Sequence, residues 1–79
     1  MIERKLVPVN EEYAIAVVTE RMNDGGWAVV ASIKHQTPSG EQVTDLPIHD
    51  QRYADQRDAE EAGVRQGRDW LASNVAHAA

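Results

Sequence analysis

The side chains that most often carry out chemistry in proteins are few in this sequence and lie far apart. The three histidines are His35, His49 and His77, and their spacing does not bring them together as metal ligands. Cysteine is absent, which removes a thiolate nucleophile, a thiolate zinc ligand and any disulfide. The serines also lack the glycine-flanked sharp turn that exposes a nucleophile in many hydrolases. We therefore expect no metal site and no catalytic nucleophile.

Two other patterns that could act on a substrate have simpler structural interpretations. Four carboxylates lie close together in the sequence: Asp55, Asp58, Glu60 and Glu61. Paired carboxylates can serve as general acid and base, but at the start of a helix they usually cap it and face water. Gly25 and Gly26 open no helix, so they do not form a loop that cradles phosphate. The sequence predicts a protein that is not an enzyme and has no cofactor.

Length and charge narrow the class of protein further. With 79 residues the chain is one small domain, and its net charge of −5 disfavours binding to nucleic acid or to an anionic membrane. No apolar run approaches the roughly 20 residues that span a bilayer, so we expect no membrane association. The first residues also lack the pattern of a signal peptide, and we expect a cytoplasmic protein.

Hydrophobic periodicity and turn signals predict the elements that would position any site. β-branched runs predict strands over 13–22 and 27–36, joined by an Asp-Gly turn that favours a hairpin. After a second turn, a weaker strand is expected over 41–48, with Pro47 placing its end at an edge. A helix follows, with Asp55 as its N-cap and its end near residue 75 or 76. The predicted class is α+β: a three-stranded antiparallel meander with one C-terminal helix packed on one face, β-β-β-α.

The predicted domain boundaries follow from these elements. Residues 1–12 are expected to form an N-terminal tail or a short edge strand, residues 13–76 the single β-β-β-α domain, and residues 77–79 a frayed C-terminus. One side of the helix combines small and apolar residues at helical spacing: Ala59, Gly63, Gly67, Trp70, Leu71 and Asn74. Because a glycine inside a helix costs about 1 kcal/mol relative to alanine, the two glycines indicate a close approach to the sheet.

The first strand is apolar on both of its faces, although a helix can cover only one of them. Residues from two strands would share the uncovered face and form a partner-binding surface: Ala14, Ala16, Val18, Ala28 and Val30. We expect Leu46 and Ile48 to join this face. Its partner would be a second copy, giving a homodimer, or another protein. The alternative is that the N-terminal segment 6–9 folds back and covers this face.

Nucleic-acid binding is the alternative function. Some DNA readers place the face of a small sheet in the major groove. The groups available for such contacts are Arg21, Trp27, Lys34 and His35, and we expect Arg21 and Lys34 to lie near each other across the hairpin. A third hypothesis is a small-molecule binder with its site between sheet and helix.

Several motifs also resemble those of a group of small uncharacterised bacterial proteins, many of them proteobacterial. The group has a Gly-x-Trp hairpin, an alanine-rich helix start and a Gly-Arg-x-Trp helix end. The matching residues here are Gly25, Trp27, Ala54, Ala59, Gly67, Arg68, Trp70 and Leu71. The resemblance covers roughly residues 13–72 and implies a β-β-β-α fold without an established activity.

A more distant similarity of layout concerns the plant ethylene-response DNA-binding domain, the integrase amino-terminal domains and a haemolysin-activator family of bacterial regulators. Those proteins use basic strand faces, and this similarity implies the nucleic-acid alternative. The present chain lacks most of the arginines that such a face needs.

Overall fold

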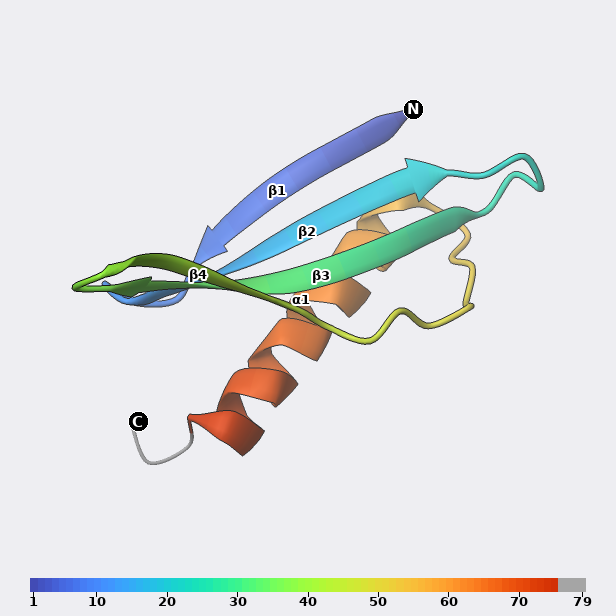
Figure 1. Cartoon of the computed structure of the whole chain (residues 1–79). Coiled ribbons are helices and arrows are strands. Elements are labelled where there is room, and N and C mark those ends of the chain that lie inside the picture. The colour runs from blue at the N-terminus through green and yellow to red at the C-terminus, as the bar shows by residue number, and fades with distance from the viewer. Residues whose placement is uncertain (76–79) are drawn as a thin grey trace.

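A four-stranded antiparallel sheet with a helix across one of its faces makes up the fold (Figure 1). The structure is a computed structural model, and it describes residues 1–75. The strands are β1 (Ile2–Pro8), β2 (Tyr13–Arg21), β3 (Trp27–Thr37) and β4 (Gly40–Asp45), and the helix is α1 (Gln56–Asn74). Neighbours in the sheet are also neighbours in the sequence, so the strands form a meander in the order β1-β2-β3-β4. Residue 76 and the predicted frayed end at 77–79 lie outside the described residues.

The predicted class, α+β with an antiparallel sheet and a C-terminal helix, is confirmed, but the predicted number of three strands is wrong. The additional strand is β1, which pairs with β2 over its whole length, for example Leu6 with Ala16. Its side chains alternate, with Val7 against the core and Leu6 exposed. Pro8, which has no amide to donate, stands at the end of this edge strand, where no ladder hydrogen bond requires one.

Short turns with a clear chemical basis connect the four strands. Between β1 and β2 the side-chain Oδ1 of Asn10 accepts hydrogen bonds from the backbone amides of Glu12 and Tyr13, at 2.8 and 2.9 Å. Gly25, in the predicted hairpin turn, has a φ of +88°, a conformation that side chains with a β-carbon rarely adopt. These turns fix the register in which the strands pair.

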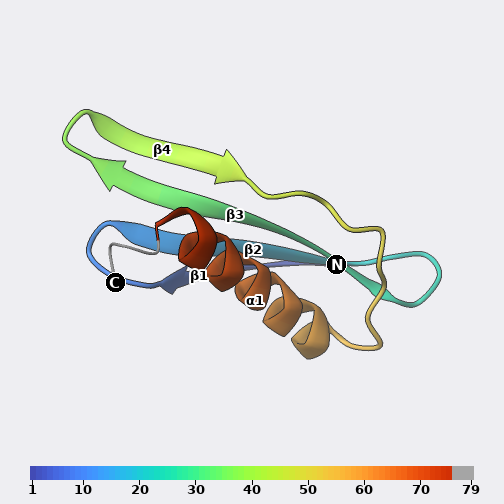
Figure 2. The same ribbon diagram turned by 90° about the horizontal axis from the view of Figure 1, so that it is seen from below.

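The core lies between the sheet and α1. Its buried apolar residues are Ile15, Val17, Ala31, Ile33, Leu46 and Ala59. From α1, the two glycines of the predicted stripe, Gly63 and Gly67, are also buried. Figure 2 shows α1 lying on one side of the sheet, and its contacts are mainly with β2 and β3. Within residues 1–75, no helix lies over the opposite side of the sheet.

The segment after β4 departs from the prediction. The strand ends at Asp45 instead of residue 48. Leu46 then donates its amide to the carbonyl of Ala31 at 3.0 Å and is only 3% exposed, on the helix side of the sheet, whereas Ile48 is 73% exposed. The prediction that Leu46 and Ile48 join the uncovered face is therefore wrong, because the first is in the core and the second lies beyond the sheet.

Candidate functional site: the open face of the sheet

The candidate site is the face of the sheet opposite α1, which we call the open face. Because side chains alternate along a strand and paired residues share a face, the register defines its members. Its apolar residues come from all four strands: Ile2, Leu6, Ala14, Ala16, Val18, Ala28, Val30 and Val43. One row across the sheet runs from Leu6 through Ala16 and Ser32 to Asp45.

The open face is apolar and accessible to solvent. Four of its larger side chains remain well exposed: Leu6 at 55%, Val43 at 54%, Ile2 at 47% and Val30 at 39%. The central strand β2 contributes the small side chains of Ala14 and Ala16 together with Val18, and these three are half-buried. A surface of small and β-branched residues on a sheet is flat enough for a second flat surface to pack against it.

The five residues predicted as a partner-binding surface, Ala14, Ala16, Val18, Ala28 and Val30, all lie on this face. The alternative, in which the N-terminal segment covers the face, is wrong, because β1 lies beside β2 in the plane of the sheet. The sequence-based reasoning missed Ile2, Leu6 and Val43. Ile2 and Leu6 join the face only through the pairing of β1 with β2, and the charged run from Glu3 to Lys5 that separates them gives no alternating pattern from which to predict it.

Charges of both signs occur among the polar residues of the open face. The register places Arg4 beside Val18 and Lys34 beside Ala14. The acidic residues of the same face are Glu20, Glu41 and Asp45. The face is thus apolar with mixed charges, and it is not the basic surface that a phosphate backbone would select.

The four residues of the nucleic-acid alternative do not form one surface. Lys34 lies on the open face, whereas Arg21, Trp27 and His35 lie on the helix side. His35 stacks on Tyr13 with ring centroids 4.2 Å apart. Arg21 pairs with Trp27 at one end of the hairpin, while Lys34 pairs with Ala14, about 23 Å away along β2. The expected proximity of Arg21 and Lys34 is therefore wrong.

The acidic cluster at the start of α1 has structural partners. Oδ1 of Asp55 accepts the backbone amide of Asp58 at 2.9 Å, as an N-cap does. The carboxylate of Glu60 accepts hydrogen bonds from the Lys5 ammonium at 3.0 Å and from Gln56 at 3.2 Å, and these two bonds lower the pKa of Glu60. The ion pair connects β1 to α1. The contacts of Asp55 and Glu60 are those of a helix cap and of a link between a strand and a helix.

His35 and His49 are exposed to different degrees on separate elements, and His77 lies outside the described residues. Within residues 1–75 no group of three or more metal-ligating side chains is placed to hold an ion. Over the same range, no helix is both long enough and apolar enough to cross a lipid bilayer.

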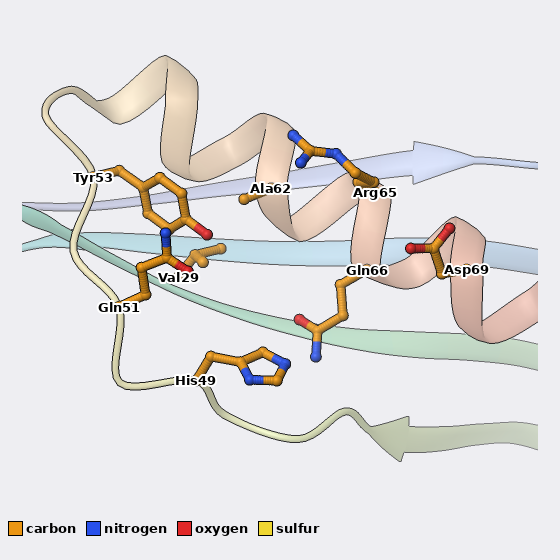
Figure 3. A pocket seen from close by; sticks show the side chains of 8 residues that line it. All are labelled: Val29, His49, Gln51, Tyr53, Ala62, Arg65, Gln66 and Asp69. Carbon is orange, nitrogen blue, oxygen red and sulfur yellow. The ribbon is translucent and has the colours of Figure 1, made fainter.

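A pocket of about 230 Å³ lies between α1 and the segment that leads into it (Figure 3). Figure 3 shows Gln66 extending from α1 toward this segment, where His49 lies; the Gln66 amide donates to the carbonyl of Pro47 at 2.7 Å. Arg65 and Asp69 come from the helix, and Tyr53 from the segment. The pocket is smaller than the roughly 300–1,000 Å³ of typical ligand sites, and its lining combines polar side chains with those of Val29 and Ala62. This pocket is therefore a weaker candidate than the open face.

In comparisons with known proteins, the chain matches no protein-family model, and no curated protein or solved structure shows significant similarity to it.

Proposed function

We propose that this chain is a small interaction module that associates with a second copy of itself through the open face of its sheet. The observation that carries the proposal is the composition of that face. An antiparallel sheet with one covered face usually presents polar residues on the other. Here the solvent side carries Leu6, Val30 and Val43, each more than a third exposed, on three different strands. Burial against a second apolar surface would remove this area from water.

Charge supports a second copy as the partner. A two-fold interface brings the same surface of both copies together, so the surface must complement itself. The open face meets this condition because Arg4 and Lys34 lie on it together with Glu20, Glu41 and Asp45. A strongly basic or strongly acidic partner would meet like charges on the same face. A second copy can instead pair unlike charges around an apolar centre.

The dimensions of the face set the area that the contact can bury. Four strands at the usual spacing are about 19 Å wide, and nine residues of strand are about 30 Å long. Two such faces would bury about 1,100 Å², near the lower end of the area of specific interfaces. We expect two sheets packed about 10 Å apart, with a dimer that forms at micromolar concentration and dissociates on dilution.

Sedimentation equilibrium across a range of protein and salt concentrations tests the proposal. The wild-type protein should reach the mass of a dimer and keep it in high salt, because apolar burial is not screened. Val30→Glu places a charge in the centre of the face and should give a monomer at micromolar concentration. The matched control is Ile48→Glu, which changes an exposed apolar residue outside the face and should remain a dimer.

Two results would contradict the proposal. One is a wild-type monomer at every concentration, and the other is equal association of the two glutamate variants. A parallel titration with duplex DNA tests the alternative of nucleic-acid binding. Phosphate contacts would give an affinity for DNA that falls steeply as the salt concentration rises. We expect no such salt-dependent binding.

A further inference from the structure

We infer that the free edge of β1 is a second self-association site, at which the β1 strands of two copies pair antiparallel into one continuous eight-stranded sheet. This inference goes beyond the proposed function, because it uses the edge of the sheet and not its open face. Among the described residues, the sheet order leaves β1 with a neighbouring strand on one side only. An exposed strand edge is a template for pairing with another strand.

The backbone groups that β1 presents to solvent follow from its ladder. The amide of Arg21 donates to the carbonyl of Met1 at 3.0 Å, and the amide of Val9 donates to the carbonyl of Tyr13 at 2.9 Å. In an antiparallel ladder the residues that bond to the neighbouring strand alternate. Odd-numbered residues of β1 therefore bond to β2. The amides and carbonyls of Ile2, Arg4 and Leu6 point outward.

Only one centred register of two β1 strands pairs unlike charges. When the two-fold axis passes through Arg4, Ile2 lies opposite Leu6 of the second copy, and Leu6 lies opposite Ile2 of the second copy. On the helix side the same register sets Glu3 opposite Lys5 of the second copy, twice. A shift of the axis by one residue places Glu3 opposite Glu3 or Lys5 opposite Lys5, and like charges directly opposite destabilise a sheet.

The contact has one unfavourable feature, which is Arg4 opposite Arg4 at the two-fold axis. Arg4 pairs with Val18 within its own sheet, so the carboxylate of Glu20 is its diagonal neighbour on the same face. A long side chain next to solvent can turn toward that carboxylate. The two Glu3–Lys5 pairs and two Ile2–Leu6 pairs oppose this single repulsion.

The other free edge, β4, does not complement itself in this way. The amide of Leu46 donates to Ala31, so the outward residues of β4 are Glu41, Val43 and Asp45. A two-fold axis at Val43 would place Glu41 opposite Asp45 of the second copy on both sides. Two pairs of opposed carboxylates disfavour that contact. Of the two edge strands, β1 is therefore the one suited to pair with a second copy.

Amide hydrogen exchange in a Val30→Glu background tests the inference, because that variant removes the proposed contact of the open face. The amides of Arg4 and Leu6 should exchange freely at micromolar concentration and gain protection at millimolar concentration. The amides of Glu3 and Lys5 serve as internal controls, since they bond to β2 at every concentration. Unchanged exchange of Arg4 and Leu6 would overturn the inference and leave the proposed function untouched.

A mixing experiment tests the register in the same background. Glu3→Lys alone sets lysine opposite lysine, and Lys5→Glu alone sets glutamate opposite glutamate, so each should dimerise about tenfold more weakly. An equimolar mixture restores two unlike pairs and should recover the association. If the mixture associates no more strongly than either variant alone, the proposed register is wrong. Thermal denaturation of both variants verifies that each is folded, because Lys5→Glu also removes the contact with Glu60.

Discussion

Gly67 and Ile15 approach each other so closely that a β-carbon added to residue 67 would lie 2.6 Å from Cγ2 of Ile15. Gly63 is similarly close to two valines, because a β-carbon added to residue 63 would lie 2.8 Å from the side chains of Val17 and Val29. The backbone of α1 therefore rests directly on β2 and β3. This close contact holds α1 over the central strands, and it covers one face of the sheet while the other stays open.

Gly67→Ala should destabilise the protein despite the better helix propensity of alanine. Alanine gains about 1 kcal/mol in a helix interior, whereas overpacking a tight core costs about 1–3 kcal/mol. Ile15 is fully buried and β-branched, so its side chain has little freedom to move away. We expect a net loss of up to about 2 kcal/mol in the free energy of unfolding, measured by urea denaturation.

A double-mutant cycle with Ile15→Ala identifies the cause of that loss. Removing the Ile15 side chain removes all three atoms nearest to the added β-carbon. In that background Gly67→Ala should become neutral or stabilising by up to about 1 kcal/mol. An equal loss in both backgrounds would show that contact with Ile15 is not the reason for glycine.

Local patterns predicted much of this fold. The alternation in β2 predicted that Ala14, Ala16 and Val18 share the face left uncovered by the helix, and they lie there. The helix stripe was also predicted, and its two glycines do approach the sheet as expected. These features depend on the spacing of residues within one strand or helix, and that spacing can be read from the sequence.

The fourth strand depended on a contact that no local pattern displays. β1 carries three consecutive charged residues and ends at Pro8, a composition typical of a tail, and its pairing with β2 becomes visible only in the ladder. For the same reason Leu6 was missing from the predicted site. Its place on the open face exists only because β1 lies beside β2.

Leu46 and Ile48 provide a direct test of the corrected end of β4. Leu46→Ala should reduce the free energy of unfolding by about 2–5 kcal/mol, because it removes a side chain that is only 3% exposed in the core. Ile48→Ala, at a position 73% exposed, should change it by no more than about 0.5 kcal/mol. Urea denaturation of both variants measures the two changes in the free energy of unfolding. Similar losses for the two would place Ile48 in the core as well.

Asp55 should stabilise α1 through the acceptor atom of its side chain. Its backbone is extended, and its Oδ1 accepts the amide of Asp58 at 2.9 Å. Asp55→Ala should cost about 1 kcal/mol, measured by urea denaturation, because that amide loses its partner. Asp55→Asn keeps an acceptor oxygen and should cost much less. If the two variants lose equally, the charge of Asp55 matters more than its hydrogen bond.

The pair of Glu60 and Lys5 should make stability depend on pH in the acidic range. The hydrogen bond from Lys5, assisted by one from Gln56, lowers the pKa of Glu60 from its ordinary value of 4.5. The folded state thus binds the Glu60 proton less readily than the unfolded state does. The folded state is therefore stabilised above pH 4.5, and this stabilisation declines as the pH falls through the lowered pKa. Glu60→Gln removes this contribution, so urea denaturation should show its deficit relative to wild type shrinking on acidification. High salt should reduce the deficit at neutral pH, since the Lys5 side chain is 53% exposed and therefore screened. A deficit constant from neutral pH to well below 4.5 would contradict the assignment of the shift to Glu60.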